Sequence, residues 1–252
     1  LSRNNFEQVT SDTLLVCISQ SGKSWEVVEL ANKAKGVTTV VGIFNKEGSP
    51  LSEIVDYSLL IYAGDEWNIS NKTYLCTQAV LNIFAHVLID EFNDAFKTEC
   101  NTVKEWIAGW LKDYQSNTGP LYELAKDTLF YDFFADGESF STVNQAALIF
   151  REGPEVFTGT TESSDYAHGW YWAQKPGYLG LNFAPNYTED SADKKMVDRT
   201  LENKGKIILF TQSKVDKKPG LEIVSLPNVR KSLVPLMEII PCDTLMGLIL
   251  GE

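Results

Sequence analysis

The sequence predicts an α/β protein built from two tandem, doubly wound, flavodoxin-like units, each a parallel sheet in a three-layer α/β/α arrangement. Short apolar runs alternate with amphipathic segments, and continuous apolar runs are typical of parallel strands buried on both faces. The alternation stops at a turn-rich stretch, residues 116–120, and then starts again. We therefore expect a first unit over residues 1–117 and a second over residues 118–252.

The expected elements of the first unit follow from apolar periodicity. Its strands are β-branched or apolar runs at residues 13–19, 37–44 and 57–63. Its helices are expected at residues 24–35, 72–97 and 102–115.

The second unit repeats this order. Its strands are expected at residues 128–135, 177–184, 205–211 and 221–225, and its helices at residues 141–152, 189–203 and 243–250. Ligands of doubly wound sheets bind beyond the carboxyl ends of the strands. Chemistry is therefore expected in the loops that follow Ile18, Phe44, Tyr62 and Phe134.

The charge balance limits the partners of this chain. Its 252 residues include 22 Lys and Arg but 34 Asp and Glu, giving a net charge of -12. Nucleic acids and anionic membranes are bound by clusters of basic residues, so we expect neither as a partner. No apolar run is expected to approach the roughly 18 residues that span a bilayer.

The cysteines and histidines argue against a metal centre. The cysteines at positions 17, 76, 100 and 242 lie far apart, without CxxC spacing, and are expected to be buried free thiols in a reducing cytoplasm. The two histidines, His86 and His168, lie on separate elements. His86 lies within an apolar helical segment and is expected in the core. We therefore do not expect a metal ion here, and the reaction that the family resemblance described below implies needs no organic cofactor either.

The stretch "SQSGKS" follows the first predicted strand and ends like a nucleotide-binding P-loop. A P-loop requires a glycine five residues before Gly22, where this chain has Cys17. A side chain there obstructs the backbone that wraps the phosphates, so we do not expect a nucleotide. Two interpretations remain: a cradle for one phosphate monoester, or a serine-rich cap of the following helix.

The phosphate interpretation depends on donors that meet at one helix end. Ser19, Ser21 and Ser24 supply hydroxyls, and Gln20 supplies an amide. The free N–H groups and the positive dipole end of the next helix point to the same place. Together they suit a dianionic phosphate ester.

Three motifs in the first unit occur at consistent spacing. They are Ser19-x-Ser21-Gly22-x-Ser24, then Asn45, Ser49, Leu51 and Asp56, then Ala63, Gly64 and Glu66. This pattern resembles the sugar isomerase (SIS) domain of phosphosugar-handling enzymes. The resemblance implies that Ser19, Gln20, Ser21 and Ser24 hold a sugar phosphate.

The second unit is similar to the second SIS domain of glucosamine-6-phosphate synthases and fructosamine-6-phosphate deglycases. "AALIFRE" and "DYAHGWY" place Glu152 and His168 sixteen residues apart, as in that family. The resemblance implies that Glu152 moves a proton between C1 and C2 of an open-chain sugar and that His168 opens the ring. The alternatives are a solvated carboxylate at a helix end and a histidine packed among aromatic residues.

The chain also departs from the family pattern. "ISNKT" differs from the usual segment after Ala-Gly-x-Glu, so Ile69 and Asn71 are weaker candidates for sugar binding. Gln145 replaces an acidic residue, and Trp170 replaces the proline after His-Gly. The Gly-Thr-Ser loop that begins the family's first domain, the glutaminase domain and the tail lysine are expected to be missing. Glutamine-dependent synthase activity is therefore not expected.

The resemblance implies a cytoplasmic isomerase or deglycase that acts on a phosphorylated amino sugar or a fructosamine 6-phosphate. It further implies a homodimer, or a dimer of dimers, in which subunits share active sites. The alternative is a phosphosugar-binding sensor that has lost turnover. The sequence leaves open which sugar and which amine are bound.

Overall fold

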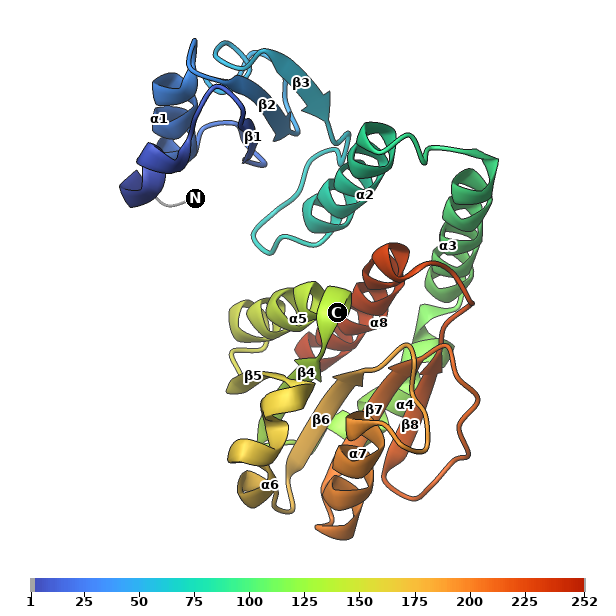
Figure 1. Ribbon diagram of the computed structural model, residues 1–252. Helices are drawn as coiled ribbons and strands as arrows, with labels where there is room; N and C mark the ends of the chain where they lie inside the picture. The colour runs from blue at the N-terminus through green and yellow to red at the C-terminus, as the bar shows by residue number, and fades with distance from the viewer. Residues whose placement is uncertain (1–2, 252) are drawn as a thin grey trace. The chain divides into compact units, whose positions relative to one another are not determined.

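The computed structural model describes residues 3–251 and divides the chain into two compact units, residues 1–89 and 90–252 (Figure 1). The expected boundary between residues 117 and 118 lies inside a helix, α4 (Tyr114–Ala125). The helix expected over residues 72–97 is therefore divided between the units, and the helix expected over residues 102–115 belongs to the second unit. The units are described one at a time.

Unit 1 contains a three-stranded parallel sheet in the order β1-β2-β3. Its elements are η1 (Arg3–Gln8), β1 (Leu14–Ile18), α1 (Trp25–Ala34), β2 (Thr39–Phe44), β3 (Tyr57–Leu60) and α2 (Lys72–Leu88). Helix α1 packs its buried Ala31 and Ala34 with Leu15, Cys17 and Phe44 of the sheet. Small residues on the buried face let this helix approach the strands closely.

Unit 2 contains a five-stranded parallel sheet in the order β5-β4-β6-β7-β8. Its strands are β4 (Phe130–Ala135), β5 (Thr158–Glu162), β6 (Tyr178–Phe183), β7 (Lys206–Thr211) and β8 (Leu221–Ser225). Its helices are α3 (Asp94–Lys112), α4 (Tyr114–Ala125), η2 (Gly137–Ser139), α5 (Phe140–Glu152), η3 (Ser163–His168), α6 (Trp170–Ala173), α7 (Ala192–Glu202), η4 (Lys231–Leu233) and α8 (Val234–Leu250). The strand order reverses between β4 and β6, which confirms the doubly wound, flavodoxin-like prediction for this unit.

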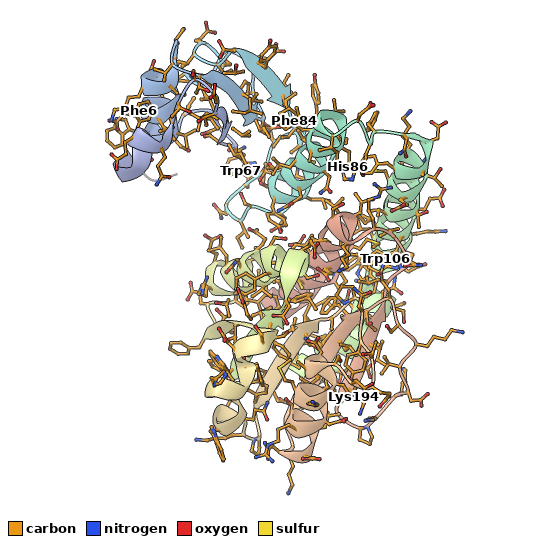
Figure 2. All side chains as sticks on the ribbon, in the orientation of Figure 1. Phe6, Trp67, Phe84, His86, Trp106 and Lys194 are labelled. Atoms are coloured by element: carbon orange, nitrogen blue, oxygen red, sulfur yellow. The ribbon has the colours of Figure 1, made fainter. Side chains whose placement is uncertain are left out.

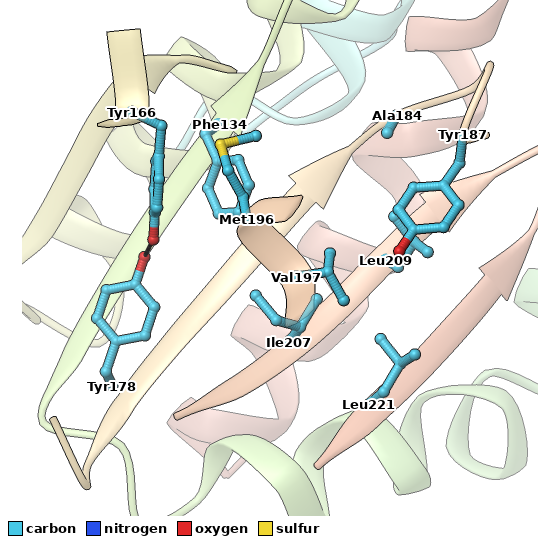
Figure 3. Close-up of a cluster of buried hydrophobic side chains, with 10 residues drawn as sticks. All are labelled: Phe134, Tyr166, Tyr178, Ala184, Tyr187, Met196, Val197, Ile207, Leu209 and Leu221. Carbon is cyan, nitrogen blue, oxygen red and sulfur yellow. Dashed lines mark hydrogen bonds between the residues drawn. The ribbon is translucent and has the colours of Figure 1, made fainter. Parts of the chain in front are cut away.

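The core of unit 2 lies on both faces of this sheet, giving three layers. Helices α4, α5 and α8 cover one face, and α6 and α7 lie on the other. Phe134 and Leu209 from the strands pack with Met196 and Val197 of α7 in one buried cluster (Figure 3). Burial of each such side chain stabilises the fold by about 1.5–3 kcal/mol.

The single long helix expected over residues 72–97 is wrong, because the structure has two helices with a break after Leu88. Asp90 adopts a positive φ of 56°, and the Asn93 side chain caps α3 by accepting a hydrogen bond from the Phe96 N–H at 3.0 Å. Because apolar residues continue on both sides of the break, the apolar periodicity of the sequence does not reveal it.

The turn expected at residues 116–120 is also wrong, because α4 continues through Pro120. Contacts with other helices outweigh the turn preference of this stretch. The Asn117 side chain donates to the Trp110 carbonyl at 3.0 Å, and the Thr118 hydroxyl donates to Thr244 of α8 at 2.8 Å. Local propensity is weaker than such tertiary packing.

Strand β5, which pairs with β4 at the edge of the sheet, was not predicted. Its sequence, "TGTTE", has no large apolar residue, so it lacks the signal of a buried strand. Helix α8 begins at Val234 rather than at the expected residue 243. Pro235 lies in its first turn and Pro241 inside it, and both obscure the helical pattern.

The expectation that no apolar run approaches membrane-spanning length is wrong. The helical segment Lys231–Leu250 has a mean hydropathy of 1.8 and is long enough, although Glu238 and Asp243 interrupt it. The segment is 67% buried inside the protein, where α8 contacts α3, α4 and α5. This is the pattern of a core helix.

The cysteines are free thiols, as predicted, but only Cys17 and Cys242 are buried, and Cys76 and Cys100 are partly exposed. His86 on α2 is buried, as predicted (Figure 2), and its Nδ1 lies 2.7 Å from the Asn82 carbonyl oxygen.

Candidate functional site

The serine loop, residues 19–24, connects β1 to α1. Ser19 is buried, and its Oγ lies 2.9 Å from the Oγ of Ser24. The Lys23 N–H donates to the Ser21 hydroxyl at 3.2 Å. Ser24 occupies the N-cap position of α1, yet its side chain makes no capping hydrogen bond in the part of the chain that is described. The hydroxyls of Ser19 and Ser24 thus lie in contact at the start of α1, and the Ser24 N–H also donates to the Ser19 Oγ at 3.5 Å.

The serine loop is braced by the segment that carries the second motif. The Asn45 N–H donates to the Gln20 carbonyl at 2.9 Å, and the Leu51 N–H donates to the Gly22 carbonyl at 3.0 Å. Ser49 is buried against Gly22, whose φ is +63°. These contacts fix the loop from its outer side and explain the glycine, because only glycine adopts this φ without strain.

Asn45 also joins the third motif to the loop. Its Oδ1 accepts the Ala63 N–H at 2.9 Å, and its Nδ2 donates to the Gly64 carbonyl at 2.7 Å. A single side chain therefore holds the ends of β2 and β3 together at the carboxyl edge of the sheet. This is the edge at which ligands of such sheets bind.

Glu66 fixes the segment that contains the two weaker sugar-binding candidates. Its carboxylate accepts the N–H groups of Asn71 at 3.0 Å and Thr73 at 3.3 Å, and also the Thr73 hydroxyl. This ties down the N-terminus of α2. Ile69 and Asn71 are half-buried. The Asn71 Oδ1 is buried without a hydrogen-bond partner among the described atoms.

Glu152 and His168 both belong to unit 2, whereas the serine loop belongs to unit 1. Glu152 is the last residue of α5 and is exposed. His168 is the last residue of η3, is also exposed, and precedes Gly169, whose φ is 154°. An exposed imidazole argues against the alternative of a histidine packed among aromatic residues.

A polar cavity of about 200 Å³ lies at the carboxyl ends of β4 and β6, where the strand order of unit 2 reverses. Asp136, Ser139, Asp193 and Lys231 are among the residues that line it. We expected chemistry in the loop after Phe134 but predicted no individual site residue in that loop. The signal that could have found them is the polar run "DGES" directly after a buried strand.

Ser139, which lines this cavity, also contacts a buried carboxyl group that no sequence pattern indicated. Glu238 of α8 accepts hydrogen bonds from the Ser139 hydroxyl at 2.8 Å and from the Thr142 hydroxyl at 2.9 Å. Burial raises the pKa of Glu238 to about 7, although the two hydroxyls act in the opposite direction.

No family model matches the chain. The chain is 24% identical over 256 residues to the glutamine–fructose-6-phosphate aminotransferase (isomerizing) of Thermococcus kodakarensis, covering 96% of this chain and 42% of that protein. It thus spans about two fifths of the length of this curated relative.

Solved structures show the same fold. The C-terminal domain of glucosamine-fructose-6-phosphate aminotransferase from Francisella tularensis matches with a TM-score of 0.81 and 22% identity, covering 94% of this chain and 72% of that chain. Tagatose-6-phosphate ketose/aldose isomerase from Escherichia coli matches with a TM-score of 0.74 and 17% identity, covering 100% and 73%.

Proposed function

We propose that this chain, which has the SIS fold and is homologous to the isomerase domain of the aminotransferases, binds a phosphorylated sugar and transfers a proton between C1 and C2. The observation that carries the proposal is the serine loop, in which the hydroxyls of Ser19 and Ser24 meet at the start of α1. The bracing by Asn45 and Ser49 keeps these donors in place before a ligand arrives.

In this proposal the phosphate replaces the contact between the two hydroxyls. Ser19, Gln20, Ser21 and Ser24 donate to its oxygens, and the positive end of the α1 dipole favours its charge. The buried Oδ1 of Asn71 accepts a hydrogen bond from a sugar hydroxyl, and Ile69 contacts the sugar through its backbone. The loop then discriminates phosphorylated sugars from free sugars.

Glu152 is the proposed base that removes the proton from one carbon and returns it to the other, and His168 is the proposed proton donor and acceptor at the ring oxygen. In deglycation, the same shuttle converts a ketoamine to an imine. Water then adds to the imine carbon, and the amine leaves with a sugar 6-phosphate as the second product. The exposure of both side chains in unit 2 agrees with a role at a surface that substrate reaches.

The proposal includes shared sites. His168 completes the site of a neighbouring subunit in a homodimer or a dimer of dimers, without a metal ion or organic cofactor. The protein acts in the cytoplasm. Glutamine-dependent synthesis is not part of the proposal, which concerns the residues of this chain alone.

A phosphosugar sensor without turnover is the second candidate. Trp170, in place of the family's proline after His-Gly, stacks on Phe130 with the ring centroids 6.1 Å apart. Its indole also lies where a β-carbon of Gly159 would come within 2.6 Å. The indole therefore gives the segment next to His168 a packing role in this chain.

Incubation with fructosamine 6-phosphates and with glucose 6-phosphate distinguishes the two candidates. The enzyme proposal predicts release of amine and hexose phosphate from a fructosamine 6-phosphate, or conversion of glucose 6-phosphate to the ketose. In either case Glu152→Gln should lower the rate of turnover at least about 100-fold. Tight binding without turnover, unchanged in Glu152→Gln, would support the sensor. Absence of binding to every hexose 6-phosphate tested would contradict both.

A further inference from the structure

Tyr166 lies two residues before His168 in η3 and is completely buried, although His168 is exposed. Its ring packs against Phe134 of β4 with the centroids 4.6 Å apart. Figure 3 shows the Tyr166 side chain reaching toward Tyr178, with the two hydroxyl groups in contact. The segment that carries the candidate imidazole is therefore anchored in the core by its immediate neighbour.

The Tyr166 hydroxyl belongs to a chain of buried hydrogen bonds. The Gln174 Nε2 donates to it at 2.8 Å, Tyr166 and Tyr178 share the next hydrogen bond, and Tyr178 donates to the Asp132 Oδ2 at 2.7 Å. Each hydroxyl can thus accept one hydrogen bond and donate one. Because each donation orients the next group, the chain has a single direction, from Gln174 to Asp132 on β4.

The same chain continues to α7. The Gln174 Oε1 accepts from Asn203 at 3.1 Å, and the Gln174 Nε2 also donates to Thr200 at 2.6 Å. Thr200 donates to the Met196 carbonyl at 2.9 Å. Tyr166 lies before His168 in the sequence and Gln174 lies after it, and the two residues are hydrogen-bonded to each other. The same hydrogen bonds connect them to strand β4 through Asp132 and to helix α7 through Thr200.

The start of η3 is held separately by two carboxylates. The Ser163 hydroxyl donates to Asp193 at 2.9 Å, and the Ser164 N–H donates to Asp136 at 3.2 Å. With Tyr166, three anchor points within four residues precede the exposed imidazole. An exposed side chain can be placed reproducibly only if its backbone is held in this way.

We propose that Tyr166 is a positioning residue, whose hydroxyl holds the η3 backbone so that His168 is presented in a fixed orientation. This inference rests on the proposed role of His168. Packing alone does not require the hydroxyl, since phenylalanine has the same ring and would fill the same space against Phe134. The buried polar chain instead specifies one orientation of the segment.

A double-mutant cycle tests this role. We expect Tyr166→Phe to lower kcat about 10-fold on whichever hexose 6-phosphate or fructosamine 6-phosphate is turned over, with KM changed less than about twofold. In a His168→Asn background, Tyr166→Phe should have no further effect, because it acts only through the imidazole. Tyr187→Phe, at a buried tyrosine of the same cluster, is the matched control and should leave kcat unchanged.

An equal loss from Tyr166→Phe in both backgrounds would overturn the positioning role. If His168→Asn itself retains full activity, the proposed function of His168 is wrong. That outcome is separate from failure of the positioning role of Tyr166. A readout without turnover then decides the positioning role: the Cε1–H resonance of His168, identified by its loss in His168→Asn, should shift in Tyr166→Phe and not in Tyr187→Phe. A His168 resonance that does not move in Tyr166→Phe would overturn the proposal. Tyr178→Phe is a second variant, because it interrupts the same series of hydrogen bonds.

Discussion

Gly22 and Ser49 are in such close contact that a β-carbon at position 22 would lie 2.1 Å from the Ser49 Oγ and 2.5 Å from its Cβ. The two residues belong to different sequence motifs, one in the serine loop and one after β2. The segment that carries the second motif therefore packs directly against the serine loop, so the two motifs form one structural unit.

Gly22→Ala should therefore destabilise the protein by about 2–4 kcal/mol, because the clash with Ser49 adds to the strain of a positive φ. The control is Gly36→Ala, where φ is +78° and nothing lies within 4 Å of the added carbon. That variant should lose only about 1 kcal/mol. Urea unfolding of both variants measures the difference, and Ser49→Gly should partly restore Gly22→Ala. Equal losses at positions 22 and 36 would contradict the close contact.

Glu66→Ala should destabilise the N-terminus of α2, because the Thr73 hydroxyl and the N–H groups of Asn71 and Thr73 lose their acceptor. We expect a loss of about 1–2 kcal/mol in the free energy of unfolding, with faster amide hydrogen exchange at the start of α2. The neighbouring exposed acid provides a control: Asp65→Ala removes a surface ion pair with Lys46 and should change stability by less than about 0.5 kcal/mol. A result in which the two variants behave alike would refute the capping role.

The buried carboxyl group of Glu238 should make stability depend on pH. Burial raises its pKa from 4.5 to about 7, so between these values the folded protein holds a proton that the unfolded chain has released. Stability is therefore highest below the unfolded pKa and falls as the pH rises through the folded pKa. The expected decrease is about 3 kcal/mol between pH 4.5 and pH 7.

Glu238→Gln removes this dependence without removing the side chain's length. We compare the denaturant concentration at which each protein unfolds. The midpoint of the variant minus that of the wild type should be larger at pH 8 than at pH 5. Some dependence should remain, because burial also raises the pKa of Asp132 to about 7. Glu222→Gln on β8 is the control. Parallel pH profiles for wild type and Glu238→Gln would show that Glu238 is not the group responsible.

The sequence predicted those parts of the fold whose signal is local. The strands at residues 130–135, 178–183 and 206–211 are continuous apolar runs between polar breaks, and the structure has them within about two residues of the prediction. Strand β5 could not be found in this way, since "TGTTE" gains its pairing from β4 rather than from its own side chains. The continuity of α4 through Pro120 likewise depends on contacts with other helices, whereas the break after Leu88 has a local cause, the Asn93 cap of α3.

The same distinction holds for the candidate site. The serine loop could be predicted because its donors are adjacent in the sequence. The brace from Asn45 to Gly64 was visible only as motif spacing, and its reason, two hydrogen bonds from one amide, required the structure. The buried chain from Gln174 through Tyr166 and Tyr178 joins residues whose partners lie on different elements, and no periodicity reveals it.

The central claim, that the serine loop binds the phosphate of a sugar, is tested most directly by titrating the ¹⁵N-labelled protein with glucosamine 6-phosphate and with glucosamine. The account predicts that only the phosphorylated sugar shifts the amide resonances of residues 19–25. It further predicts that Ser21→Ala weakens binding by about 10-fold or more, while Ser11→Ala, at an exposed turn of the same unit, does not. Equal affinity for both sugars, or unmoved loop resonances on saturation with glucosamine 6-phosphate, would contradict it.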